Sequence, residues 1–306
     1  MSGDAPTIAF VLPTKDRPDE IRTMLRSLEA QDARPAQVIV VDSSAEPSAS
    51  LPGEFPSLPI EFVRFEGKPS AAAQRNEGAS RVSPTLDLIC FFDDDQVLLD
   101  GALGAMLRFW SEASPDVAGA GFNLVNEIDT RPALVKRSRL AEWLGLYSRT
   151  PGAVAPSGWQ ALPGVVEHDL DVEWLTTGAV VWRREVLDHI RFDEFFDGYS
   201  YLEDLDFSYS VSREHRLVLV AAAHVHHFPS KRGRMVWRRF GQIEVRNRLY
   251  FVRKHGLSVV RCFLGLGVRF LLSLGLGVVK PSSGGLSRAW GNVTGLFRFA
   301  GAGPVA

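Results

Sequence analysis

Three consecutive aspartates, Asp93, Asp94 and Asp95, follow an apolar segment that ends in Phe91-Phe92. Like charges repel at short range, so neighbouring carboxylates are costly to hold together without a compensating cation. Mg²⁺ and other hard divalent cations bind carboxylate oxygens together with substrate phosphates. The triplet therefore favours a divalent-metal site, and the alternative interpretation is a solvated acidic turn.

A second acidic pair, Glu203-Asp204, follows Leu202 at the predicted start of a helix over residues 203–214. Carboxylates at this position can cap a helix and complement its dipole. A carboxylate can also act as a general base that takes a proton from an attacking hydroxyl. The pair alone leaves both interpretations open.

Histidines and basic residues follow a predicted strand over residues 217–227. By strand alternation His224 and His226 share one face, whereas His227 points the other way. One imidazole could complete the metal shell, or all three could be surface or hydrogen-bonded residues. Lys231 and Arg232 come next and could bind phosphate or simply face solvent.

Alternating strands and helices must position these residues. Apolar segments predict buried strands over residues 8–12, 38–41, 60–65 and 86–92. Helices are predicted between them, one beginning at Pro18 and one over residues 71–80. This alternation predicts an α/β fold with a mainly parallel sheet. Ligands of such sheets bind beyond the carboxyl ends of the strands, where Thr14, Asp42 and the three aspartates are expected.

The rest of the chain is less regular. Further strands are predicted over residues 117–125 and 174–182, the latter containing Thr177-Gly178, and a basic helix over 235–255. Residues 126–171 remain unassigned. Residues 257–279 are strongly apolar apart from Arg261 and Arg269, and this length can span a bilayer of about 30 Å. However, Arg269 falls near the centre, where an arginine costs at least about 2.5–3.5 kcal/mol on insertion scales.

Charge is distributed unevenly along the 306 residues. Residues 229–306 contain 14 Lys and Arg against one acid, Glu244, whereas residues 1–228 contain 20 basic and 35 acidic residues. Such a tail suggests an anionic partner: a membrane surface, phosphates or nucleic acid. We expect the tail to hold the protein on a membrane surface, and the alternative is packing in a soluble core or dimer interface. Two cysteines without disulfide or zinc spacing, and an N-terminus without a secretory pattern, favour the cytoplasm.

Seven segments, in their order along the chain, together resemble family 2 glycosyltransferases. They are IAFVLPTKDRP, VIVVDSS, AAAQRNEGAS, FFDDDQ, TTGAVVWRREVL, YLEDLDFSYSV and HVHHFPSKRG. The resemblance covers roughly residues 7–255 and implies the GT-A nucleotide-diphospho-sugar fold. RNRLYFVRKHG is similar to bacterial members that build surface polysaccharides, including rhamnosyl- and galactofuranosyltransferases.

The resemblance implies a role for each matching residue. Those expected to bind the donor nucleotide are Pro13, Thr14, Arg17, Asp42, Arg75, Asn76, Asp93 and Asp94. Asp95 would ligate the metal, Mg²⁺ or Mn²⁺, and His226 would join the metal or the diphosphate. The adjacent His227 leaves that register uncertain by one.

The acceptor side is implied in the same way. Thr177, Gly178 and Ala179 would border the donor sugar and the acceptor. Asp204 resembles the catalytic base, with Glu203 beside it. A single displacement would then invert the anomeric configuration. Lys231 and Arg232 are the expected phosphate contacts.

The expected organisation is a catalytic domain over residues 1–228 and a basic, apolar helical region over 229–306. The donor-binding half would cover about 1–100 and the acceptor half about 101–228. The expected partners are a UDP-, dTDP- or GDP-sugar, a glycan or polyprenyl-linked acceptor, and the inner face of the cell membrane. A homodimer is compatible with the sequence, and nucleic acid is not an expected partner.

Other functional classes explain fewer of the motifs. A sugar-nucleotide nucleotidyltransferase usually begins with a Gly-rich phosphate loop after the first strand, and VLPTKDRP contains no glycine. A dinucleotide dehydrogenase is disfavoured because GxGxxG is absent. A nonenzymatic basic membrane- or nucleic-acid-binding protein would explain the tail but not the acidic motifs.

Overall fold

The computed structural model describes residues 6–126, 138–229 and 236–299. Backbone contacts divide the chain into two units, which we call the sheet unit and the helical unit. The sheet unit comprises residues 1–129 and 163–233, and the helical unit comprises residues 130–162 and 234–306.

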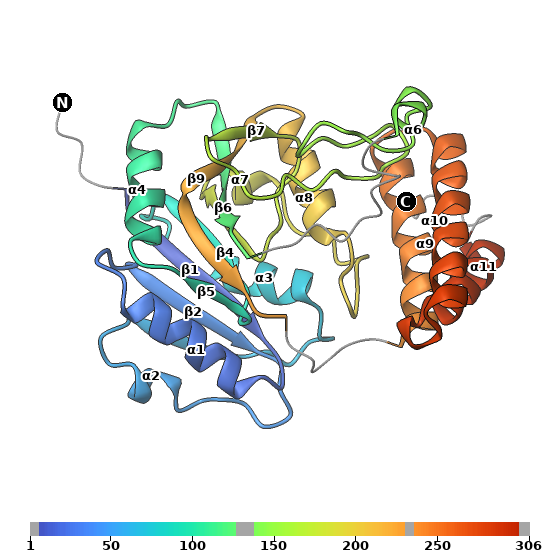
Figure 1. The fold of residues 1–306 in the computed structure, drawn as a ribbon. Coiled ribbons are helices and arrows are strands. Elements are labelled where there is room, and N and C mark those ends of the chain that lie inside the picture. The colour runs from blue at the N-terminus through green and yellow to red at the C-terminus, as the bar shows by residue number, and fades with distance from the viewer. Residues whose placement is uncertain (1–5, 127–137, 230–235, 300–306) are drawn as a thin grey trace. The chain divides into compact units, whose positions relative to one another are not determined.

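Parallel strands form the first half of the sheet. They are β1 (Ile8–Thr14), β2 (Gln37–Asp42), β3 (Ile60–Arg64) and β4 (Leu88–Phe92), in the spatial order β3-β2-β1-β4. The connecting segments contain α1 (Pro18–Glu29), the short α2 (Leu51–Glu54) and α3 (Ala71–Ser80) (Figure 1). The carboxyl ends of β1, β2 and β4 therefore meet at one edge of the sheet.

The second half of the sheet is mixed. Beyond β4 the order continues through β8 (Ala179–Arg183), β6 (Val117–Leu124), β9 (Arg216–His227) and β5 (Gln96–Leu98), and β7 (Leu170–Val172) pairs with β9. The helices of this half are α4 (Ala102–Glu112), α7 (Val186–His189) and α8 (Glu203–Ser212). Because β8 runs antiparallel to β4, the segment that enters β8 lies at the edge where β4 ends.

Both faces of the parallel half are covered, which explains its continuous apolar sequences. Phe10 and Val40 pack on the same side as the buried face of α1, whereas Val11 and Val41 pack on the side of α3. The predicted helix that begins at Pro18 is confirmed, and its buried face consists of Ile21, Met24, Leu25 and Leu28.

Local sequence signals mark the starts of α1 and α3. Pro18 occupies the first turn of α1, and the hydroxyl of Ser70 accepts a hydrogen bond from the Ala73 N–H at the start of α3. The α/β fold is confirmed. The predicted strand over 174–182 is correct only in its second half, because β8 begins at Ala179. Trp174 and Leu175 are buried as irregular core residues, so their apolar character imitates a strand.

The helical unit contains α6 (Arg139–Trp143), α9 (Trp237–Lys254), α10 (Val259–Val279), a 3-10 turn (Pro281–Ser283) and α11 (Gly285–Phe299). Helix α11 packs against both α9 and α10 (Figure 1). The buried guanidinium of Arg248 in α9 stacks 4.5 Å from the ring centre of Trp159 and hydrogen-bonds the carbonyl of Gly158. Residues 138–162, which the sequence left unassigned, thus belong to the same unit as the terminal helices.

Gly78 in α3 provides a test of how closely this helix packs on the sheet. A Cβ at this position would overlap Val11 and lie 3.1 Å from Val41 Cγ2. We expect Gly78→Ala to lower the free energy of unfolding by about 1–3 kcal/mol, the usual cost of overpacking. Urea denaturation measures this change.

Gly53→Ala in α2 is the matched control, because no described atom outside its own helical turn lies within 4 Å of the added methyl group. The control should be neutral or slightly stabilising. Equal losses in the two variants would contradict the close approach of α3 to the sheet.

Candidate active site

The guanidinium of Arg75 joins the two acidic motifs. From α3 it donates to Glu203 Oε1 at 2.5 Å and to Asp93 Oδ1 at 2.7 Å. Arg75 is only 2% exposed, and its guanidinium lies 5.7 Å from the ring centre of Phe192. The turn after β4 and the first turn of α8 are therefore held together by one buried cation.

Burial controls the charges of Glu203 and Asp204. Burial raises the pKa of Glu203, and the Arg75 guanidinium opposes part of that rise. The pKa of Asp204 is also raised by burial, while the hydrogen bond from the Leu205 N–H to its carboxylate opposes the rise. Two neighbouring carboxyl groups thus hold protons more strongly than they would in water.

The segment that leads into α8 adopts an uncommon backbone conformation. Ser200 and Leu202 have φ angles of 52° and 76°, in the left-handed region that disfavours residues other than glycine. The Ser200 hydroxyl accepts a hydrogen bond from the Ala71 N–H at 3.0 Å, and Lys68 pairs with Asp197. Contacts with the start of α3 therefore hold a strained turn in front of Glu203 and Asp204.

The second aspartate of the triplet is tied to the end of β1. Thr14 Oγ1 donates to Asp94 Oδ2 at 2.7 Å, and Arg17 donates to Asp94 Oδ1 at 2.8 Å. Burial raises the pKa of Asp94 to about 7, although Arg17 and Thr14 favour its ionised form. Arg17 also lies 3.3 Å from Asp95 Oδ2, so it bridges two carboxylates of the triplet.

Asp95 meets a histidine from β9. Its Oδ1 lies 3.5 Å from Nε2 of His227, because Gln96 at the start of β5 pairs with His227. His226 points elsewhere, and its ring packs against Phe228. The family resemblance implies a metal contact for His226, with a register that is uncertain by one. The contact with Asp95 is made by His227.

The donor atoms at Asp95 fit a divalent cation that shares its shell with phosphates. Among the described residues, no group of three His, Cys, Asp or Glu side chains is arranged to hold a metal ion. Asp95 and His227 supply one carboxylate and one imidazole. Mg²⁺ and Mn²⁺ accept such partial protein shells when substrate phosphates and water provide the remaining oxygens.

The segment before β8 lies directly beside the triplet. The carbonyl of Gly178 accepts a hydrogen bond from the Asp93 N–H at 2.8 Å, and Ala179 pairs with Phe92. A Cβ at Gly178 would overlap the Gln96 amide and lie 3.1 Å from Asp93 Oδ2, so a larger residue would displace the Gln96 side chain. Thr177 is buried, with its hydroxyl 3.4 Å from Glu203 Oε1.

Other predicted residues lie near the strand ends but have structural contacts. Asp42 is fully buried, and its two oxygens accept the N–H groups of Ser44 and Ser48, each at 2.8 Å. Pro13 is a buried residue of β1. Asn76 exchanges hydrogen bonds with the backbone of Phe192 at 2.9 and 3.0 Å.

These contacts show that Asp42 organises the loop after β2, and that Asn76 fixes the segment before α8 instead of joining the acidic cluster. Lys231 and Arg232 lie outside the described residues.

Two glutamines at the site were missed by the sequence analysis. Gln74 donates to the carbonyls of Thr14 and Val41 at 2.9 and 2.8 Å and so joins the ends of β1 and β2 to α3. Gln96 is buried, and its Oε1 has no hydrogen-bond partner among the described residues. A glutamine carries no charge signal, and only the adjoining motifs AAAQRN and DDDQ could have indicated these two.

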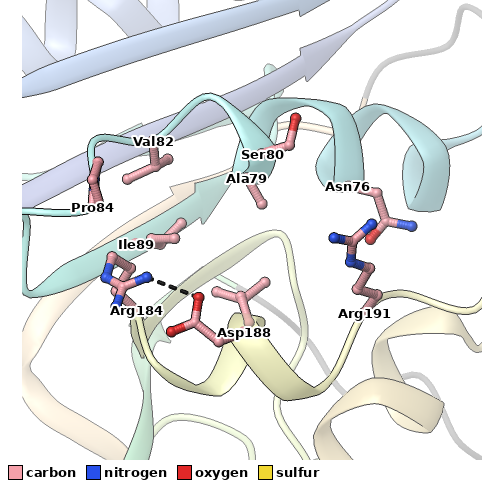
Figure 2. A pocket seen from close by; sticks show the side chains of 10 residues that line it. Asn76, Ala79, Ser80, Val82, Pro84, Ile89, Arg184, Asp188 and Arg191 are labelled. Atoms are coloured by element: carbon pink, nitrogen blue, oxygen red, sulfur yellow. Dashed lines mark hydrogen bonds and ion pairs between the residues drawn. The ribbon is translucent and has the colours of Figure 1, made fainter.

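A separate pocket of about 230 Å³ lies between α3, β4 and α7 (Figure 2). Figure 2 shows Asn76, Ile89 and the ion pair of Arg184 with Asp188 on its wall. Ile89 belongs to the amino-terminal part of β4, whereas the aspartates follow its carboxyl end. The pocket is therefore distinct from the acidic cluster.

Comparison with known proteins identifies the family. The model of glycosyl transferase family 2 matches residues 9–160. The uncharacterized glycosyltransferase YwdF of Bacillus subtilis is 27% identical over 101 residues, which cover 33% of this chain and 37% of YwdF. An uncharacterized glycosyltransferase of Haemophilus influenzae is 26% identical over 149 residues, which cover 45% of this chain and 50% of that protein. The chain thus spans half or less of these curated relatives.

Solved structures share the fold at low sequence identity. S. aureus TarS 1–349 aligns with a TM-score of 0.52 at 16% identity, covering 80% of this chain and 65% of that one. The mannosyltransferase PcManGT from Pyrobaculum calidifontis, in complex with GDP-Man and Mn²⁺, aligns with a TM-score of 0.54 at 16% identity. That alignment covers 96% of this chain and 88% of PcManGT. These comparisons confirm the GT-A fold and the resemblance to family 2.

Arg75 provides the test of the buried bridge. We expect Arg75→Met to lower the free energy of unfolding by about 3–5 kcal/mol, because it leaves the Glu203 carboxylate buried without its cation. Adding Glu203→Gln to this variant should recover part of the loss. Urea denaturation of the single and double variants measures both effects.

Arg81→Met is the matched control, because Arg81 pairs with Glu61 and Glu77 on the surface. Its loss should stay below about 1 kcal/mol. If Arg75→Met were no more destabilising than Arg81→Met, the acidic motifs would not depend on Arg75.

Proposed function

The chain belongs to glycosyltransferase family 2, and we propose that it transfers a sugar from a nucleotide-diphosphate donor to an acceptor hydroxyl with inversion of the anomeric carbon. The observation that carries the proposal is the Arg75 bridge, which joins Asp93 of the triplet to Glu203. The aspartate triplet suits a donor with its metal, and the Glu203-Asp204 pair suits proton removal from an acceptor.

The donor side of the proposal uses residues at the ends of β1 and β4. Thr14, Arg17, Asp93 and Asp94 would contact the nucleotide, with Pro13 forming the wall beside them. Asp42 and Asn76 would support this region through the loops they organise. The GDP-Man and Mn²⁺ in PcManGT, and the UDP in a TarS 1–349 complex, support a nucleotide-sugar donor.

A divalent cation, Mg²⁺ or Mn²⁺, would be held by Asp95 and by His227, which replaces the His226 of the sequence analysis in our proposal. Such a cation stabilises the negative charge that develops on a leaving diphosphate. Arg17 would orient Asp94 and Asp95 toward it. Lys231 and Arg232 remain the predicted phosphate contacts.

The acceptor side of the proposal centres on Asp204. A base is most effective when its pKa approaches the working pH, and burial raises the pKa of Asp204 in that direction. Glu203 would keep Asp204 in place through its contacts with Arg75 and Thr177. Thr177, Gly178 and Ala179 would border the donor sugar and the acceptor hydroxyl.

We further propose the acceptor class and the place of the reaction. The acceptor would be a glycan or a polyprenyl-linked sugar in the synthesis of surface polysaccharide. The resemblance of RNRLYFVRKHG to bacterial transferases of that pathway supports this class. The enzyme would act in the cytoplasm at the inner face of the cell membrane, where such an acceptor is presented.

Replacement of Asp204 tests the catalytic assignment. We expect Asp204→Asn to leave donor affinity nearly unchanged and to reduce kcat by roughly 10²-fold or more, the scale for loss of a general base. The measurement is transfer or hydrolysis with a panel of UDP-, dTDP- and GDP-sugars. Glu214→Gln, at an exposed residue beyond the end of α8, should retain wild-type kcat. A defect confined to donor affinity would make Asp204 a binding residue.

The adjacent histidines test the metal assignment as a matched pair. We expect His227→Ala to weaken Mn²⁺-dependent binding of the donor nucleotide at least about tenfold, whereas His226→Ala leaves it unchanged, because only His227 contacts Asp95. Calorimetry with UDP, dTDP and GDP, with and without Mn²⁺, measures this difference. Asp95→Ala should abolish the metal dependence, and the exposed Asp100→Ala should not. If His226→Ala weakened Mn²⁺-dependent binding and His227→Ala did not, the metal contact would belong to His226.

A further inference from the structure

The helical unit exposes many large apolar side chains, which an ordinary soluble helix bundle would bury. Among the described residues, all but three of the exposed large hydrophobic side chains belong to this unit, and the three others are Val165, Tyr199 and Phe228. The exposed apolar residues of α6, α10 and α11 include Leu140, Trp143, Leu264, Leu271, Val278, Leu286, Trp290 and Phe297. A soluble bundle buries such residues and exposes its polar ones.

The exposure of apolar residues is most extensive in helix α10. Within residues 262–279, every exposed residue is Phe, Leu, Val or Gly, and the buried ones are mostly small, such as Gly265, Ser273 and Gly277. Only 28% of its most apolar window is buried inside the protein, so α10 is not the core helix of a soluble domain. At about 100° per residue, the exposed positions cover more than half of the helix circumference.

Three charged residues of the bundle pair inside it, whereas its other described charges include the exposed Arg238, Arg239, Lys254, Arg261, Lys280 and Arg298. Glu244 of α9 is 1% exposed and accepts two hydrogen bonds from the Arg288 guanidinium, at 2.6 and 3.1 Å. It also accepts one from Asn292 at 3.1 Å, and Arg269 Nε lies 3.3 Å from its Oε1. Arg269 is the single charged residue of segment 262–279, and its partner is the single acid of the chain beyond residue 228.

Small residues bring the three helices into close backbone contact. A Cβ at Gly241 of α9 or at Gly291 of α11 would overlap the backbone of the facing helix, and one at Gly277 of α10 would overlap the start of α11. Close packing through glycine and polar residues turned toward the bundle interior are features of helices that associate in lipid.

We propose that the faces of α10 and α11 that carry these exposed residues are embedded in the acyl-chain region of a lipid bilayer. Helix α10 has 21 residues and is about 31 Å long at 1.5 Å per residue, which matches a hydrocarbon core of about 30 Å. Glu244 offsets the cost of placing Arg269 at that depth, because the arginine enters lipid as part of an ion pair.

Lipid accounts for this surface better than a second copy of the chain. A helix–helix interface covers one stripe of a helix, whereas the exposed apolar positions of α10 extend over more than half of its circumference. Exposed Trp143 and Trp290 add amphipathic side chains of the kind enriched at membrane interfaces.

Insertion of apolar helices also differs from attraction of a basic tail to anionic headgroups, because insertion requires no lipid charge. The proposal is independent of the sugar-transfer reaction.

Flotation of the full-length chain with neutral phosphatidylcholine vesicles at about 1 M salt tests insertion, since such salt screens surface attraction. The wild-type chain should float with the vesicles. Leu264→Glu combined with Leu271→Glu should lower the ratio of vesicle-bound to unbound protein at least about tenfold, because two carboxylates would enter hydrocarbon. Both leucines are exposed, so the fold should be retained, and circular dichroism checks this.

Val165→Glu is the matched control, because Val165 is 53% exposed in the sheet unit and Leu264 is 54% exposed in the helical unit. It should float like the wild type. A wild-type chain that stays unbound and monodisperse without detergent would overturn the proposal. A detergent-free dimer that does not float, and that Leu264→Glu with Leu271→Glu dissociates, would assign the surface to a second copy and also overturn it.

Discussion

The geometry of the sheet unit depends on one buried guanidinium between two carboxylates. Asp93 and Glu203 come from the turn after β4 and the first turn of α8, and without Arg75 their charges would push these segments apart. Burial makes the Glu203 charge costly, but it also strengthens the attraction to Arg75, since Coulomb energies grow as the local dielectric falls. The two effects make the partners interdependent, because loss of Arg75 leaves Glu203 either as an unsolvated charge or as a protonated acid.

The direction of β8 explains why the acidic residues and Gly178 meet at this edge of the sheet. A fifth parallel strand would place its own carboxyl end there, but β8 runs antiparallel to β4 and brings the loop that precedes it. Gly178 lets this loop pass within hydrogen-bond distance of Asp93, and the positive φ angles of Ser200 and Leu202 aim the start of α8 at the same place. Local strain is thus stored where Arg75 and the Ser200–Ala71 hydrogen bond can hold it.

Much of this arrangement could be predicted from sequence, because periodicity and strand ends are local properties. The apolar face of α1, the Ser70 cap and the edge shared by Thr14 and the aspartates all follow from patterns a few residues long. The roles of Asp42, Asn76 and Gln74 depend on backbone groups that no short sequence pattern specifies. The choice between His226 and His227 required the pairing of β5 with β9, which only the folded sheet defines.

Part of the charge of the basic tail lies inside the helical bundle. Fourteen Lys and Arg against one acid suggested a surface that meets anions. Glu244, the one acid, is buried and neutralises part of the charge of Arg269 and Arg288, while Arg248 is buried against Trp159. These three arginines are therefore structural, and the outer faces of the bundle combine exposed leucine, valine and aromatic side chains with the remaining exposed Lys and Arg residues. Along residues 262–279 the one charge, on Arg269, is paired with Glu244 inside the bundle while apolar side chains face outward, which is the condition that a hydrocarbon solvent imposes.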